Sequence, residues 1–270
     1  MKAFIVDLSR CNGCYCCQIA CKDEHVANDW SPYAKPQPDT GQFWVKVREE
    51  VRGTVPKVKI SYTPEFCLHC DDPDCLKVCR FGAIYRREDG MVLIDPNKCT
   101  GCKLCADYCA HDRIFFNEDL NLAQKCTGCA HLIDDGWDMP RCVDNCPTGA
   151  LKYGDEADFA EQIAKAEFAS DKCKGRVYYL NRPRKFVAGT VYDPVEKEVV
   201  IGASCTLKDK YSDQTFTVET DNFGDFWFTG LPDGEYFYTL TIEKDGKHRC
   251  IEAFDATRDV NLGDIPLRLS

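Results

Sequence analysis

The chain has 270 residues, a formal net charge of −10 and 20 cysteines. Hydrophobic residues make up 44% of it, which is enough for a buried core and excludes wholesale disorder. No run approaches the roughly 18 apolar residues of a membrane span, and the acidic balance argues against nucleic acid as the main partner. The N-terminus lacks the apolar segment that is typical of a signal peptide. We therefore expect a cytoplasmic protein, or one that is exported together with a partner carrying a twin-arginine signal.

Four cysteine groups dominate the first 154 residues. A hairpin is predicted between the second and third groups, at the turn Asp89-Gly90, and another between the third and fourth, around residues 117–121. The insert 22–66 carries two predicted strands, 43–48 and 58–62. The groups are Cys11, Cys14, Cys16, Cys17 and Cys21; Cys67, Cys70, Cys75 and Cys79; Cys99, Cys102, Cys105 and Cys109; and Cys126, Cys129, Cys142 and Cys146.

The remaining sequence changes character. Residues 155–170 read as a helix with acidic residues in its first turn, and Phe159, Ile163 and Ala166 fall near one face. Residues 176–185 read as a basic connector. Short apolar strands separated by turns follow, at 187–192, 203–207, 215–220, 226–228 and 236–242, and they predict a small β-sandwich over 186–270. The predicted domains are therefore 1–154, a linking 155–185, and 186–270.

The cysteine spacing favours iron–sulfur clusters over disulfides or zinc. Disulfides suit small secreted scaffolds, and a zinc site usually takes two cysteine pairs separated by a longer loop. The third group instead reads Cys-x2-Cys-x2-Cys-x3-Cys, as does the first when Cys16 is skipped, and Cys146-Pro147 closes the fourth. In bacterial ferredoxins the first three thiolates of this run hold one cluster and the fourth ligates another.

This exchange of the fourth cysteine predicts four ligand sets for four [4Fe–4S] clusters. Four oxidised clusters would take the formal charge from −10 to about −18. Cys16 is expected to pack or lie beside the ligands, and Cys173, Cys205 and Cys250 to be buried thiols, with a Cys205–Cys250 disulfide left open. The sets are Cys11, Cys14, Cys17 and Cys146; Cys126, Cys129, Cys142 and Cys21; Cys67, Cys70, Cys75 and Cys109; and Cys99, Cys102, Cys105 and Cys79.

These groups, in this order, resemble the iron–sulfur subunits of the dimethyl sulfoxide reductase family of molybdenum or tungsten enzymes. The runs 67–79 and 126–147 carry much of the resemblance. The tail segments 187–191, 202–207, 220–226 and 231–236 look like a transthyretin-like or Cna-B-like sandwich. A ferredoxin module followed by such a sandwich is similar to the small subunits of anaerobic transhydroxylases and of phenol or catechol hydroxylases and dehydroxylases.

The resemblance implies an α+β protein: a doubled bacterial-type ferredoxin domain and a small all-β sandwich. It also implies an electron-transfer subunit without catalytic residues, which joins a large subunit that holds Mo or W on a bis-pterin and acts on an aromatic hydroxyl compound. The third cysteine group is complete here, unlike the transhydroxylase pattern, which favours a relative with net redox turnover. The alternatives are a redox-neutral transhydroxylase, the electron-transfer subunit of a formate dehydrogenase or hydrogenase, and a structural zinc module.

Overall fold

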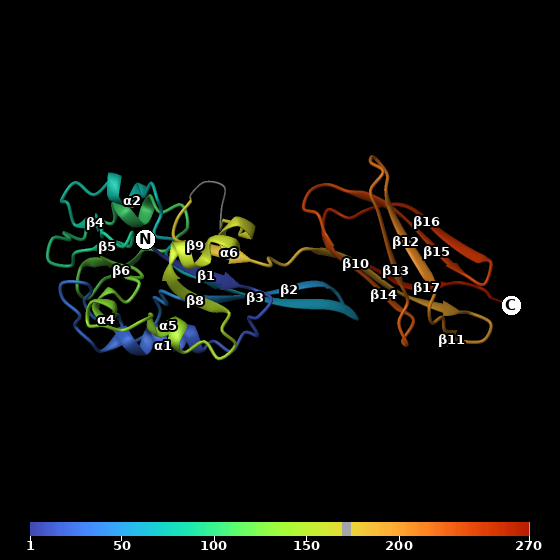
Figure 1. Cartoon of the computed structure of the whole chain (residues 1–270), viewed down its shortest axis with the longest axis horizontal. Coiled ribbons are helices and arrows are strands. Elements are labelled where there is room, and N and C mark those ends of the chain that lie inside the picture. Colours follow the sequence, from blue (N-terminus) through green and yellow to red (C-terminus); the bar gives the residue numbers. More distant parts are fainter. Residues whose placement is uncertain (169–173, 270) are drawn as a thin grey trace. The chain divides into compact units, whose positions relative to one another are not determined.

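The chain folds into two compact units, drawn in Figure 1. The computed structural model describes residues 1–168 and 174–269, so Cys173 lies outside the described residues. The first unit contains Met1–Glu49 and Ser61–Arg182, and the second contains Glu50–Ile60 and Pro183–Ser270. The tip of the insert thus belongs with the tail of the chain.

A three-stranded sheet organises the first unit, in the order β8 (Leu151–Asp155), β1 (Lys2–Asp7), β9 (Val177–Leu180). Strand β1 runs antiparallel to β8 and parallel to β9. Because side chains alternate along a strand, Phe4 and Val6 face the cysteine-rich core while Ala3 and Ile5 face the other side. Strand β9 lies where the sequence predicted only a connector, and pairing with the N-terminal strand makes it part of the first unit.

Helical turns cover the second face of this sheet. The predicted helix 155–170 is a 3₁₀ turn η1 (Glu156–Phe159) followed by α6 (Ala160–Lys165), so it is shorter than expected. Phe159, Ile163 and Ala166 pack on the small core around Ala3 and Ile5, which confirms the predicted apolar face.

Each cysteine group contains a short helix, and the two predicted hairpins lie between groups. The hairpin β4–β5 (Ile84–Arg86, Val92–Ile94) turns at Asp89, whose Oδ1 accepts from Met91 N–H at 2.9 Å. The hairpin β6–β7 is formed by Phe115–Asn117 and Leu122–Gln124. The helices are α1 (Cys16–Val26), α2 (Asp74–Lys77), α3 (Leu104–Asp107), α4 (Ala130–Asp134) and α5 (Arg141–Asp144).

The insert forms one long hairpin, β2 (Lys46–Thr54) and β3 (Lys57–Glu65), longer than the two strands expected. Its tip is part of the second unit. The buried Lys57 ammonium pairs with the Asp225 carboxylate and lies 5.8 Å from the ring centre of Trp227. Asn261 also donates to the Thr54 carbonyl at 3.1 Å.

The second unit is a sandwich of two four-stranded sheets. One sheet contains β10 (Lys185–Asp193), β11 (Glu198–Val199), β14 (Asp225–Leu231) and β17 (Val260–Pro266). The other has the order β13 (Thr215–Glu219), β12 (Ser204–Asp209), β15 (Phe237–Lys244), β16 (Lys247–Asp255). The predicted sandwich is confirmed, and β11, β16 and β17 are strands that the sequence did not indicate.

The sandwich also corrects the expectation for its cysteines. Cys205 is fully buried between the sheets, as expected, but Cys250 is exposed and both are free thiols. They lie on β12 and β16, which are separated by β15, so the disulfide left open by the sequence is not formed.

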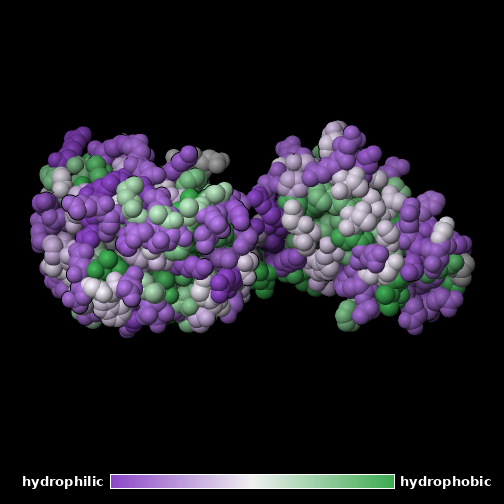
Figure 2. All heavy atoms as spheres, in the orientation of Figure 1, coloured by the Kyte–Doolittle hydropathy of each residue, from purple (hydrophilic) through white to green (hydrophobic). Residues whose placement is uncertain are grey.

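Hydrophilic residues cover most of the face drawn in Figure 2, with small apolar areas between them. In the part of the chain that the structure describes, no helix has the length and apolar character needed to cross a membrane.

Candidate metal centres

Left-handed backbone turns shape the loops that carry the cysteines. The residue before the second cysteine is Gly13, Gly101 or Gly128 in the first, third and fourth groups, with φ of +70°, +74° and +64°. Glycine adopts this conformation at little cost. A Cβ at Gly101 would overlap the Asn121 carbonyl oxygen, so the backbone there has no room for a side chain. The turns point backbone N–H groups at sulfur: Gly128 N–H donates to Cys126 Sγ at 3.4 Å.

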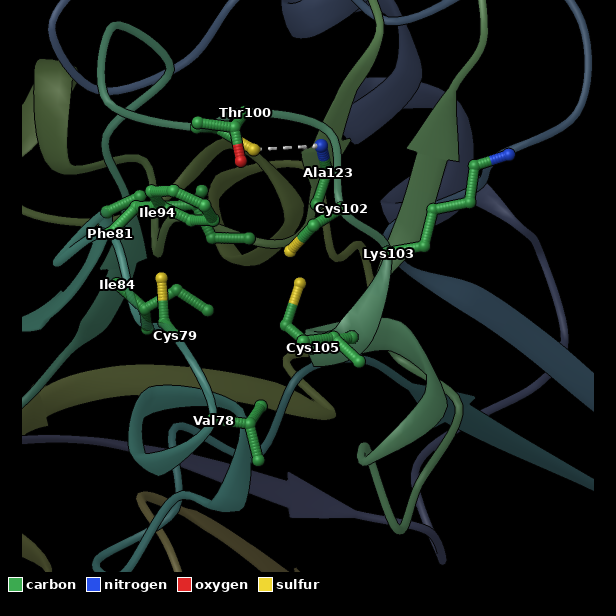
Figure 3. A pocket seen from close by; sticks show the side chains of 13 residues that line it. Val78, Cys79, Phe81, Ile84, Ile94, Thr100, Cys102, Lys103, Cys105 and Ala123 are labelled. Carbon is green, nitrogen blue, oxygen red and sulfur yellow. Dashed lines mark hydrogen bonds between the residues drawn. The ribbon is translucent and has the colours of Figure 1, made fainter.

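One ligand set lines a pocket between the second and third groups. In Figure 3 the sulfurs of Cys79, Cys102 and Cys105 point into this pocket, while Lys103 points away. The fourth lining cysteine is Cys99, whose Sγ accepts from Ala123 N–H at 3.5 Å. Burial first, and then the neighbouring thiols, raise the pKa of Cys105 to about 12. The other lining residues include the apolar Val78, Phe81, Ile84, Ile94 and Leu104.

A second pocket is lined by Cys67, Cys70, Cys75 and Cys109. Backbone N–H groups also reach these sulfurs: His69 N–H donates to Cys67 at 3.5 Å and Arg113 N–H to Cys109 at 3.4 Å. Burial raises the pKa of Cys75 to about 11. The ammonium of Lys125 opposes this effect, and Cys67 and Cys109 add to it. Folding thus places a cysteine of the third group with three of the second.

The first and fourth groups meet in the same way. Burial, and then the neighbouring Cys11, Cys146 and Cys14, raise the pKa of Cys17 to about 12. Burial would also raise the pKa of Cys146, but hydrogen bonds from the backbone of Leu151 and from Thr148 outweigh it and lower the pKa. Cys146, from the end of the fourth group, therefore lies with Cys11, Cys14 and Cys17.

Cys21 is grouped with Cys126, Cys129 and Cys142, and all four are buried. Burial raises the pKa of Cys126 to about 11 and of Cys129 to about 12. Burial, followed by neighbouring thiols of this same set, holds the pKa of Cys142 and Cys21 well above the ordinary value. Metal binding would displace these protons, because the cysteines that bind a metal are thiolates.

The four sets adjoin in series. Cys17 neighbours Cys21 and Cys142 of the next set, Cys126 neighbours Cys67, and Cys75 neighbours Cys105. We call the sets, in this spatial order, S1 (with Cys17), S2 (with Cys126), S3 (with Cys67) and S4 (with Cys105). Each end of the series has one exposed cysteine residue, Cys14 in S1 and Cys102 in S4, whereas every cysteine of S2 is buried.

Polar groups around the sets fit an anionic cluster. The Lys125 side chain is 2% exposed, and its Nζ lies 3.4 Å from Cys67 Sγ and 3.1 Å from the Cys126 carbonyl. His69 is fully buried, and its Nε2 has no hydrogen-bond partner in the structure. N–H donors and nearby cations are what an iron–sulfur cluster requires from its surroundings. Over residues 1–168 and 174–269, no three Cys, His, Asp or Glu side chains are near enough to hold a single ion.

The structure also places two residues beside the sets. Cys16 is exposed and hydrogen bonds with Cys14, so it lies beside set S1, which is one of the two positions expected for it. In the insert, Trp44 is buried and packs on His25. The sequence expectations did not include Lys125. Its signal is a lysine directly before Cys126, immediately after the uncharged strand β7.

Two family models match the chain. Residues 58–156 match the 4Fe-4S dicluster domain, and residues 187–262 match the carboxypeptidase regulatory-like domain. The pyrogallol hydroxytransferase small subunit of Pelobacter acidigallici is 36% identical over 97% of this chain and 98% of its own length. The chain is a member of this family of molybdenum-enzyme iron–sulfur subunits.

Other members share the ferredoxin part of this iron–sulfur subunit. A tetrathionate reductase subunit of Salmonella typhimurium is 36% identical over 60% of this chain and 61% of its own length. An anaerobic dimethyl sulfoxide reductase chain of Escherichia coli is 36% identical over 56% of this chain and 72% of its own length. The expected fold class, a ferredoxin-like domain followed by a β-sandwich, is thereby confirmed.

Proposed function

We propose that this iron–sulfur subunit carries four [4Fe–4S] clusters, one on each of the sets S1 to S4, and conducts electrons along them. The observation that carries the proposal is the arrangement of sixteen cysteines as four neighbouring tetrads in series, with an exposed cysteine residue at each end. Each cluster, when bound, would take up and release one electron. The role of the protein is to hold the clusters in order and keep water from the inner ones.

The partner is proposed to be a large catalytic subunit that holds Mo or W on a bis-pterin. The family supports a large catalytic partner, because its members are small subunits of molybdenum-enzyme complexes. We further propose an aromatic hydroxyl compound as the substrate of the complex. Support comes from the full-length match to a pyrogallol hydroxytransferase small subunit, since this match includes the sandwich. The expected cytoplasmic location stays a prediction.

Metal analysis with redox titration tests the proposal. We expect about sixteen iron atoms per chain and several interacting paramagnetic centres in the anaerobically purified, dithionite-reduced protein. A few zinc atoms per chain and no visible charge-transfer absorption would instead establish a structural zinc module and contradict the four-cluster proposal.

A redox-neutral transhydroxylase is a second candidate, favoured by the name of the Pelobacter relative. The two functions differ in net electron flow. If the purified complex converts its aromatic substrate only when an artificial electron donor or acceptor is present, it is an oxidoreductase. If conversion proceeds at the same rate without one, the complex is a transhydroxylase.

A further inference from the structure

We propose that Lys125 and His69 together make the cluster of set S3 the easiest of the four to reduce. This inference rests on the proposed function, because it requires a cluster on Cys67, Cys70, Cys75 and Cys109. Lys125 and His69 are not ligands, and we infer that they set the reduction potential of this cluster.

Lys125 is a buried cation without a carboxylate partner among the described residues. Its Nζ donates to the carbonyls of Val92 and Cys126 and to Cys67 Sγ. A buried ammonium that is not compensated by an anion is strongly destabilising. A cluster with a formal charge of about −2 would compensate it. Reduction adds a further negative charge beside the ammonium, so Lys125 stabilises the reduced state more than the oxidised one.

His69 is held in a costly backbone conformation at the position that is glycine in the other three groups. Its φ is +46°, in the left-handed region that glycine adopts at little cost and that other residues adopt uncommonly, although His, Asn and Asp do so more often than the rest. Strain of this kind persists where the surroundings impose it and is concentrated at functional sites. A histidine here makes side-chain contacts that the glycine of the other groups cannot make.

The hydrogen bonds of His69 indicate that purpose. Val92 N–H donates to Nδ1 at 3.0 Å, so Nδ1 carries no proton and the proton of the neutral ring is on Nε2. This N–H donor is buried and has no partner, and His69 lines the pocket of set S3. A donor left unsatisfied in a protein interior costs free energy, so we assign it to a sulfur of the bound cluster. Hydrogen bonds to cluster sulfur raise the reduction potential.

Among the described residues, the other sets have no equivalent of this ammonium. The pocket of S4 has a mostly apolar lining, and its lining residue Lys103 points away. The other buried Lys and Arg residues of the described chain, Lys57 and Arg176, are both paired with carboxylates. In S2, Arg141 is paired with Glu24 at 3.2 Å, which offsets its charge. A buried, uncompensated ammonium is thus specific to S3 and its boundary with S2.

The test is a redox titration of the full-length protein, followed by electron paramagnetic resonance, with the substitution Lys125→Met. We expect the highest midpoint potential to fall so that the ratio of reduced to oxidised cluster at fixed potential changes at least tenfold, which is about 59 mV. The S2 signal should shift less, and the signals of S1 and S4 should not move. Lys125→Arg should restore most of the shift, because it keeps the charge.

The matched control is Lys98→Met. Like Lys125, Lys98 directly precedes a ligand position in the sequence, but it is exposed and paired with Asp95 at 3.4 Å, so its removal should leave all midpoints unchanged. His69→Asn is an independent variant: asparagine tolerates the left-handed backbone but is too short to keep the Nε2 donor. It should lower the same midpoint as Lys125→Met.

The outcomes are distinct. Full iron content with unchanged midpoints in Lys125→Met overturns the inference and leaves the four-cluster proposal intact. Absence of clusters from the unsubstituted protein means that the proposed function itself fails. If Lys125→Met loses iron, His69→Asn decides: a lowered midpoint at full iron content supports the inference, and an unchanged one overturns it.

Discussion

At the scale of single residues, two cysteines of the same unit can differ completely in their exposure to solvent. Cys205 and Cys250 are both cysteines in β-strands of the sandwich, yet one is buried in its core and the other is exposed. In the first unit, the grouping of a thiol depends on a partner loop distant in sequence. Cys109 lies with Cys67, Cys70 and Cys75, although it follows Cys105 by only four positions.

This grouping predicts which cluster a single substitution disturbs. Cys109→Ser should remove or convert the cluster of S3 and leave the signal of S4 present, because serine replaces a ligand of S3 alone. Iron content and electron paramagnetic resonance of the reduced protein measure this. Cys250→Ser, at an exposed position of the sandwich, is the control and should change neither. Loss of the S4 signal with S3 intact would contradict the ligand sets.

At the scale of elements, the cluster loops depend on glycines whose surroundings differ. Gly101 and Gly82 have similar backbone conformations, with φ of +74° and +59°. Only Gly101 is closed in by neighbouring backbone, the carbonyl of Asn121 in the β6–β7 turn, whereas Gly82 has open space where a Cβ would lie. The loop of the third group and this hairpin turn are therefore packed as one piece.

The comparison gives a matched pair of substitutions. Gly82→Ala should cost about 1–2 kcal/mol, the penalty of a left-handed alanine, and keep all clusters. Gly101→Ala carries the same conformational cost and also forces the third loop away from the hairpin, so it should lower the iron content at S4. Thermal unfolding and iron analysis of both variants measure the difference. Equal effects of the two substitutions would show that the close approach does not matter.

At the scale of the whole molecule, the chain has two separate hydrophobic cores. One surrounds the cysteine sets and the sheet β8–β1–β9, and the other fills the sandwich. Phe4 and Phe226 are comparable members of these cores, exposed by 1% and 0%. Since each core is contiguous only within its own unit, damage to one should be felt mainly there.

Truncating either ring should therefore lower the unfolding temperature of its own unit and leave that of the other unit unchanged. Phe226→Ala and Phe4→Ala each should cost about 3–5 kcal/mol through the cavity left behind. In Phe226→Ala, visible cluster absorption should survive to the same temperature as in the unsubstituted protein while the β signal in circular dichroism is lost earlier. In Phe4→Ala, cluster absorption should be lost earlier. Loss of both signals together in Phe226→Ala would mean that the units unfold as one.

The sequence by itself determined the features that depend on residues only a few positions apart. The cysteine intervals indicated iron–sulfur loops, Asp89-Gly90 indicated a hairpin, and alternating apolar residues indicated a sandwich, because each signal depends on neighbours a few positions apart. Only the tertiary structure decided that 177–180 is a strand, since its apolar residues gain a partner only when β1, far away in the sequence, pairs with it. The same holds for Lys125, whose charge matters because folding buries it between Cys67 and Cys126. Its burial depends on residues far away in the sequence, so no local sequence pattern predicts it.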